Sequence, residues 1–336
     1  DTVDGDDDDD KLIWQVGASS DSFSGTNGFA ELIVQGNSAN NKLTVSESLS
    51  GNIQISDKTY QITVAPSVTR VTIDAASGND RVTIEDLSGA AGVLLVVNGQ
   101  NGSDTIDASG ADLGSVRLLV QGGDGNDTIT GYGGPDINQS GVGDVIDGGF
   151  GDDILAGSAG ADTIIGGFGN DIIAGNANDD SLVGNNGKDT VTYANSDAGV
   201  NVLLNSASNS GGHAAGDILE GFESVVGSDF DDPINANNVN AATIEGGAGN
   251  DRVEGGDGND RLSGQQGADT ILGGSGNDVI RGNRGSDELG GNGGADRLFG
   301  GAGNDFITGG NGRDIMAGGG GWGGGGEPGE GRKEDN

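Results

Sequence analysis

The chain has 336 residues, of which 71 are Gly, and its 53 acidic against 15 basic residues give a net charge of −38. Gly usually makes up only ~7% of a protein, and here just 32% of residues are hydrophobic and 4% aromatic. So polar and self-repelling a chain needs cations in order to compact, and its charge argues against nucleic acid as a partner. The absence of Cys excludes disulfides and thiolate metal sites.

The first third of the chain predicts β-structure without a strict repeat. Residues 1–11 form an acidic terminus that lacks the spacing of an EF-hand and is expected to be flexible. Residues 12–120 contain short β-rich runs and two fragments, SGNDRVTI around Asp80 and NGSDTID around Asp104. We interpret this N-terminal region as irregular, wider β-helix coils. Its longest apolar run, at 90–97, is too short to cross a membrane, so no transmembrane segment is predicted.

A nine-residue repeat follows in two blocks. The first repeat block, residues 121–192, contains GGFGDDILA, GSAGADTII and GGFGNDIIA, and the second repeat block, residues 246–318, contains eight units without a slip. A spacer, residues 193–245, separates them, and a Gly-rich tail, residues 319–336, follows and is expected to be disordered. Such self-similarity at a fixed period predicts a solenoid.

Every unit carries Asp at its sixth position, and each unit of the second block carries a large aliphatic residue or Met at its eighth. The sixth-position Asp residues are the candidate metal ligands: Asp127, Asp136, Asp144, Asp153, Asp162, Asp171, Asp180, Asp189, Asp251, Asp260, Asp269, Asp278, Asp287, Asp296, Asp305 and Asp314. The alternative for these residues is a solvated acidic turn. Asp80 and Asp104 are weaker candidates, because their neighbours are irregular.

The spacing within one unit explains why a metal site forms. Positions seven to nine make a short strand with one apolar side chain pointing inward, and the glycines of positions one to six allow a tight turn. Two units make one coil, and coils stack about 4.8 Å apart. Asp251, Asp269 and Asp287 therefore fall on one edge, and Asp260, Asp278 and Asp296 on the other.

Stacked carboxylates repel one another, by about 1 kcal/mol at 4 Å in water and more in a less polar medium, unless a cation lies between them. Carboxylate and carbonyl oxygens suit Ca²⁺ better than Mg²⁺. The core is sparse, since each coil buries about two aliphatic side chains. We therefore expect multiple calcium ions and a fold that forms only when they bind.

The pattern G-G-x-G-x-D-x-U-x, where U is a large aliphatic residue, resembles the RTX (repeats-in-toxin, hemolysin-type) calcium-binding family. The resemblance implies an all-β fold, a right-handed parallel β-roll, and assigns calcium ligation to the sixth-position Asp residues. Asn178 and Gly290 depart from the pattern of their units. Calcium ions are the implied partners, while a protein or polysaccharide partner stays unidentified.

Three functions are compatible with these features. The first is a non-catalytic extracellular calcium-binding module with a structural or interaction role, because calcium outside cells is abundant enough to fill weak sites. The second is the repeat region of a larger secreted toxin or hydrolase. The third is a polysaccharide-acting enzyme on a β-helix, for which Tyr60, Arg70, Arg81 and Arg117 are the few candidates; motifs of metalloproteases and lipases are absent from the sequence.

Overall fold

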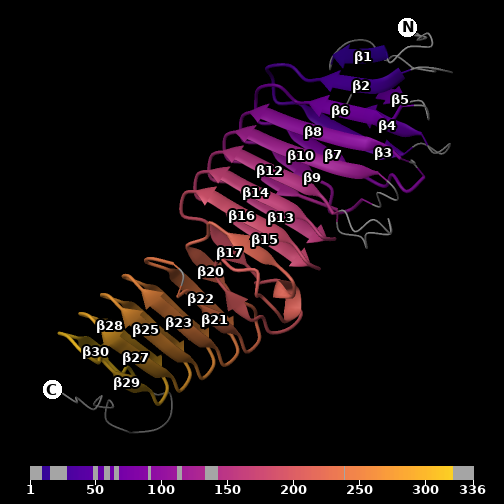
Figure 1. Cartoon of the computed structure of the whole chain (residues 1–336). Helices are drawn as coiled ribbons and strands as arrows, with labels where there is room; N and C mark the ends of the chain where they lie inside the picture. The colour runs from indigo at the N-terminus through magenta and orange to yellow at the C-terminus, as the bar shows by residue number, and fades with distance from the viewer. Residues whose placement is uncertain are drawn as a thin grey trace. The chain divides into compact units, whose positions relative to one another are not determined.

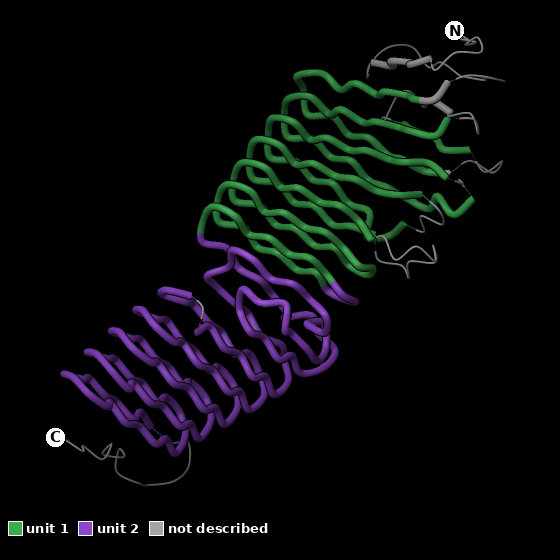
Figure 2. Tube along the Cα trace, in the orientation of Figure 1, with its two compact units in different colours: residues 1–175, 180–187 green, residues 176–179, 188–336 purple. Residues whose placement is uncertain are grey.

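A computed structural model describes residues 10–15, 29–47, 52–56, 61–63, 68–89, 92–111, 116–132, 143–237 and 239–320. The expectations for residues 1–9, for Asp136 and for residues 321–336 lie outside this part of the chain. The protein divides into two compact units, residues 1–175 with 180–187 and residues 176–179 with 188–336 (Figure 2). Each is described by itself.

The first unit is a stack of coils whose strands form parallel sheets (Figure 1). One sheet has the order β1 (Asp10–Gln15), β2 (Phe29–Gln35), β6 (Arg70–Asp74), β8 (Leu94–Asn101), β10 (Arg117–Asp124), β12 (Val145–Phe150), β14 (Thr163–Phe168) and β16 (Ser181–Asn186). The other contains β3 (Lys42–Glu47), β7 (Arg81–Ile84), β9 (Thr105–Asp107), β11 (Thr128–Thr130), β13 (Ile154–Ala159) and β15 (Ile172–Ala177).

Two strands of the N-terminal region leave the coil pattern. β4 (Ile53–Ser56) pairs antiparallel with β3, and β5 (Gln61–Thr63) pairs antiparallel with β4. The β-rich runs at 53–55 and 62–64 thus extend the edge of one sheet and do not form coils of their own. Short connections favour this outcome, because neighbouring strands joined by a few residues pair antiparallel, whereas parallel pairing needs a longer crossover.

The second unit repeats the parallel arrangement. One sheet has the order β17 (Thr190–Thr192), β20 (Ser224–Val226), β22 (Thr243–Ala248), β24 (Arg261–Gln266), β26 (Val279–Arg284), β28 (Arg297–Ala302) and β30 (Ile315–Ala317). The facing one has β18 (Val202–Leu203), β21 (Pro233–Asn235), β23 (Arg252–Asp257), β25 (Thr270–Ser275), β27 (Glu288–Gly293) and β29 (Phe306–Thr308). The spacer also contributes β19 (Ile218–Glu220) and a 3₁₀ turn, η1 (Gly212–Ala214).

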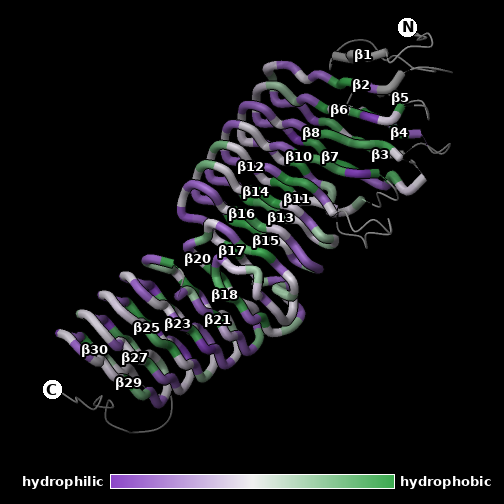
Figure 3. The backbone as a smooth tube through the Cα atoms, in the orientation of Figure 1, coloured by the Kyte–Doolittle hydropathy of each residue, from purple (hydrophilic) through white to green (hydrophobic). Residues whose placement is uncertain are grey.

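The core is a thin column of aliphatic side chains from the eighth positions. The side chains of Val253, Leu262, Ile271 and Ile280 are at most 1% exposed. On β23 and β24 the buried residues alternate with more exposed polar ones, and hydrophobic segments recur along the stacked strands (Figure 3). Met316 is only half-buried, because no coil follows β30 within the described residues. The parallel β-roll solenoid expected from the repeat is confirmed.

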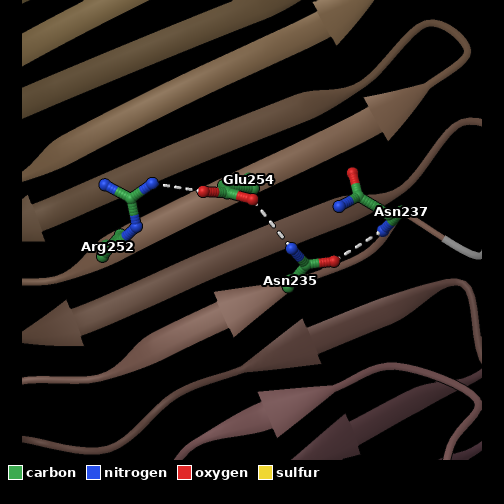
Figure 4. A network of polar contacts seen from close by, with 4 residues as sticks. All are labelled: Asn235, Asn237, Arg252 and Glu254. Carbon is green, nitrogen blue, oxygen red and sulfur yellow. Dashed lines mark hydrogen bonds and ion pairs between the residues drawn. The ribbon is translucent and has the colours of Figure 1, made fainter.

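A polar network ties the spacer to the first coil of the second repeat block. Glu254 on β23 accepts a hydrogen bond of 2.8 Å from the Asn235 side chain on β21 and is also paired with Arg252 (Figure 4). Asn235 in turn accepts the backbone N–H of Asn237. These contacts lie on the outer face of the sheet and supplement the backbone ladder between the two strands.

Candidate metal centre

The sixth-position Asp residues that the structure describes lie under their turns and not in solvent. Each stands directly before a strand, and its side chain folds back beneath the glycine turn that precedes it. Asp251, Asp260, Asp269 and Asp278 each expose 2% of their surface or less. A solvated acidic turn therefore does not describe these residues, and each buried carboxylate needs a partner.

In the second unit the carboxylates form two ladders along the stack. The Oδ1 atom of Asp269 accepts the backbone N–H of Asp251 at 2.9 Å, and Asp287 and Asp305 continue the same contact. On the other edge, Asp278 accepts from Asp260, and Asp296 and Asp314 follow. Each step joins residues eighteen apart, which is the length of one coil.

The ladders of the first unit reach beyond the regular repeat. Asp144, Asp162 and Asp180 form one of them. The other runs from Asp80 to Asp171 through the rungs Asp104, Asp127 and Asp153. Its first three steps span 24, 23 and 26 residues, and its last step, from Asp153 to Asp171, spans 18.

Asp80 and Asp104 therefore occupy the same environment as the Asp residues of the first repeat block. The signal in the sequence was the pair of fragments SGND and NGSD directly before a strand. Irregular spacing obscured it, because the extra residues lie in the connections between strands and leave the stacking of the rungs unchanged.

At many rungs the second carboxylate oxygen is buried and accepts no hydrogen bond. Among the described residues, such Oδ2 atoms belong to Asp80, Asp104, Asp127, Asp153, Asp251, Asp260, Asp269, Asp278, Asp287, Asp296 and Asp305. A buried carboxylate oxygen is rarely left unpartnered, because its desolvation is costly. The repetition of the same unsatisfied atom at successive rungs points to a cationic ligand.

The glycines of the turn bring backbone oxygens to the same place. A Cβ atom added at Gly255, the first position of its unit, would collide with the Asp260 Oδ2 atom and lie 2.6 Å from the Gly273 carbonyl oxygen. At the fourth position, Gly276 has a φ of 129° and closely approaches the carbonyl of Gly258, one coil earlier. Only glycine fits here, and columns of carbonyl oxygens run beside the carboxylates as a result.

Burial makes these carboxyl groups hard to ionise without a cation. It raises the pKa of Asp153 and Asp251 to about 7, and the neighbouring carboxylates of the ladder add to the effect, while the backbone N–H accepted by Oδ1 opposes it. The pKa of Asp127, Asp260 and Asp269 rises to about 6 for the same main reason. A bound cation would reverse this by stabilising the charged form.

The donor set fits a hard cation. No group of three acidic or His side chains gathers in the part of the chain that the structure describes, so carboxylates alone do not make a metal shell. Carbonyl oxygens of the turns must supply the other ligands. A mixed shell of carboxylate and carbonyl oxygens, without nitrogen or sulfur, is what Ca²⁺ prefers.

Three of the expected ligands have different surroundings. The Oδ2 atom of Asp144 accepts the backbone N–H of Tyr132 at 2.7 Å. Asp189 donates its own N–H to Glu223, which takes the place of a ladder Asp. Asp314 is only partly buried at the last rung.

The spacer contains one further rung that the sequence pattern did not reveal. Asp232 donates its N–H to Asp251 and so precedes it in the ladder. The segment GSDFDD, with Gly227 at the first and Asp232 at the sixth position, was the available signal.

The structure does not bring together the residues that were candidates for a polysaccharide-acting active site. Arg70 pairs with Glu31 at 3.2 Å, and Arg81, on the other sheet, lies 3.8 Å from Asp107. Arg117 lies two strands from Arg70 on the same sheet. Tyr60 lies outside the described residues.

The comparison with protein families agrees with this geometry. The family described as the RTX calcium-binding nonapeptide repeat matches residues 119–137, 141–173, 156–191, 241–271, 254–289, 263–298 and 290–321. No curated protein matched the chain. No described helix is long and apolar enough to cross a membrane. The two repeat blocks of this chain are therefore RTX calcium-binding nonapeptide repeats.

Proposed function

We propose that this chain is a secreted, non-catalytic module that folds into its β-roll when a row of calcium ions binds between the stacked turns. The sixth-position Asp residues of both repeat blocks supply the carboxylate ligands, and Asp80 and Asp104 extend the row toward the N-terminus. The folded solenoid serves a structural or interaction role.

The observation that carries this proposal is the buried Oδ2 atom that lacks a partner at successive rungs. Removing one partner from a buried ion pair costs several kcal/mol, roughly 3–5 in measured cases, because the remaining charge is uncompensated. A ladder of such charges would oppose folding at every step. Calcium supplies the compensation, and its binding energy becomes folding energy.

The extracellular setting follows from calcium supply. Extracellular modules bind calcium with Kd of order 10⁻⁴–10⁻³ M, whereas cytosolic sensors need far tighter sites. Sites of ordinary extracellular affinity would stay empty inside a cell. The chain would then be unfolded before export and fold once outside.

The test is a calcium titration of the full chain, followed by circular dichroism and calorimetry. We expect little β-signal in chelator and a cooperative gain as calcium is added. The variant Asp278→Asn should bind fewer calcium ions or bind them more weakly, because it removes a buried ladder carboxylate while keeping its shape.

The matched control is Asp257→Asn, which removes an exposed carboxylate from the third position of a neighbouring unit. This variant should titrate like the parent chain. An unchanged β-signal in chelator would refute calcium-dependent folding. Equal losses in the two variants would show that total charge, and not the ladder, determines calcium binding.

A further inference from the structure

A hollow of the first unit lies beside the glycine turn of the Asp127 rung. Its volume is about 300 Å³, and it is lined by residues of β8, β10 and β12. Two columns of side chains run through it. One consists of Asn98, Gln121 and Asp147, and the other of Asn101, Asp124 and Phe150, each residue aligned with its neighbours by strand register.

Phe150 is presented as a fixed aromatic surface. Its side chain is 55% exposed, although aromatic residues are scarce in this chain. Phe168, on the next strand of the sheet, stacks against one face of the ring, with centroids 4.8 Å apart and planes within 6°. Such stacking contributes about 0.5–1.5 kcal/mol and holds the ring in one orientation. On the other side of Phe150, its neighbour by strand register is Asp124, which also lines the hollow.

The polar side chains of the hollow match hydroxyl groups. Asn98, Asn101 and Gln121 each offer donors and an acceptor, while Asp124 and Asp147 offer acceptors.

The charge of the hollow selects among ligand classes. Two carboxylates in a chain of net charge −38 repel phosphates, sulfates and acidic sugars. A cationic ligand would satisfy the carboxylates, but it offers only donors and leaves the amide N–H groups of three side chains without acceptors. A hydroxyl both donates and accepts, so it can satisfy amides and carboxylates together.

We propose that this hollow binds a neutral oligosaccharide, with one sugar ring packed on Phe150 and its hydroxyls bonded by Asn98, Gln121 and Asp147. This inference goes beyond calcium binding. The backbone wall of the hollow includes Gly122 and Gly123, in the turn of the Asp127 rung. The hollow therefore exists only in the folded solenoid.

The experiment uses the full chain in saturating calcium and isothermal titration with cellohexaose, maltohexaose, xylohexaose and hexa-N-acetylchitohexaose. We expect binding of at least one of these neutral sugars. Phe150→Ala should weaken it about tenfold, as the loss of a stacking contact does. Phe306→Ala is the matched control, because Phe306 is 57% exposed on β29 of the other unit. It should leave the affinity unchanged.

Circular dichroism in calcium must show that both variants keep the parent β-signal, and Gln121→Ala provides a second variant outside the aromatic stack. Absence of binding by all four sugars would overturn the proposal. Binding of spermidine that depends on Phe150 would assign the hollow to cations instead. Because calcium titration is measured separately, failure here would leave the calcium-dependent fold untouched.

Discussion

The spacer and the second repeat block satisfy consecutive rungs of one ladder in different ways. In the spacer, the Asp232 carboxylate accepts hydrogen bonds from the Val200 N–H at 2.7 Å and from the backbone and hydroxyl of Ser228. In the repeat, Asp251 accepts the N–H of Asp232, but its Oδ2 atom has no partner. The difference teaches that the need for calcium is set rung by rung.

The hydroxyl of Ser228, at the second position of its turn, accounts for the contrast because it donates to the Asp232 carboxylate, whereas Ser158 at the same position before Asp162 donates to the Gly131 carbonyl. Ser228 occupies that position before Asp232, whereas Gly247 occupies it before Asp251. A serine hydroxyl can donate to the carboxylate and replace part of a cation's role. Glycine has no such group, so the regular repeat relies on an external cation. The spacer is therefore expected to tolerate calcium withdrawal better than the repeat block that it precedes.

The largest expected effect is a gain of stability in acid when calcium is absent. The pKa of Asp153 and Asp251 is about 7 in the metal-free fold and about 3.8 when unfolded. A raised pKa contributes stability that is fully present below pH about 3.8 and is lost as the pH rises through about 7. Circular dichroism in chelator should therefore show more β-signal at pH 5 than at pH 8, where we expect little.

The same measurement in calcium supplies the control for this pH prediction. Protons and calcium compete for the same carboxylates, so acidification should weaken calcium binding. The difference in β-signal between calcium and chelator should therefore be smaller at pH 5 than at pH 8. A chelated chain that loses β-structure between pH 8 and pH 5 would show that buried ladder charges do not oppose the metal-free fold.

A smaller effect is expected from filling the cradle beneath one turn. Gly255→Ala places a methyl group against the Asp260 Oδ2 atom and the Gly273 carbonyl. We expect a loss of about 1–3 kcal/mol in the free energy of unfolding, as for other overpacked sites. Thermal unfolding in calcium measures it.

Gly293→Ala is the matched substitution at an open third position, where the nearest atom to an added Cβ is 3.6 Å away. It should change the free energy of unfolding by no more than about 0.5 kcal/mol. Similar losses in the two variants would mean that glycine is needed for backbone freedom throughout the turn, and not for the close approach at the first position.

The smallest effect is expected at the spacer rung. Ser228→Ala removes a hydroxyl from the buried Asp232 carboxylate, which retains its backbone donors, and should cost about 1 kcal/mol. The loss should be the same at all calcium concentrations that permit folding, because protein groups alone satisfy the Asp232 carboxylate. Chemical unfolding at low and high calcium tests that independence. If high calcium rescues the variant, a cation also binds at Asp232.

Much of the site could be predicted from the repeat. The eighteen-residue distance between Asp251 and Asp269 predicts stacking on one edge, and the structure joins them by a hydrogen bond of 2.9 Å. The burial of the carboxylates was not predicted, since an acidic residue beside glycine is compatible with an exposed turn. Only the closed path of the turn shows that each side chain folds back beneath its own glycines.

The irregular regions could be predicted less well. β4 and β5 pair antiparallel where coils were expected, because short connections favour local pairing over a crossover. Asp80 and Asp104 were weak candidates, since spacing was the only guide and theirs is irregular. Asp232 was missed because Phe230 stands at the fourth position of its turn, where the repeat pattern has Gly.

By itself, the sequence determined the period, the inward aliphatic column and the order of the Asp rungs, because each follows from a fixed spacing along the chain. The tertiary structure decided which irregular Asp residues join the ladders. Parallel strands align by backbone hydrogen bonds, so Asp80, Asp104 and Asp127 stack despite connections of unequal length. Stacking also brought Asn98, Gln121 and Phe150, from three separate coils, to one hollow. No local sequence pattern predicts it.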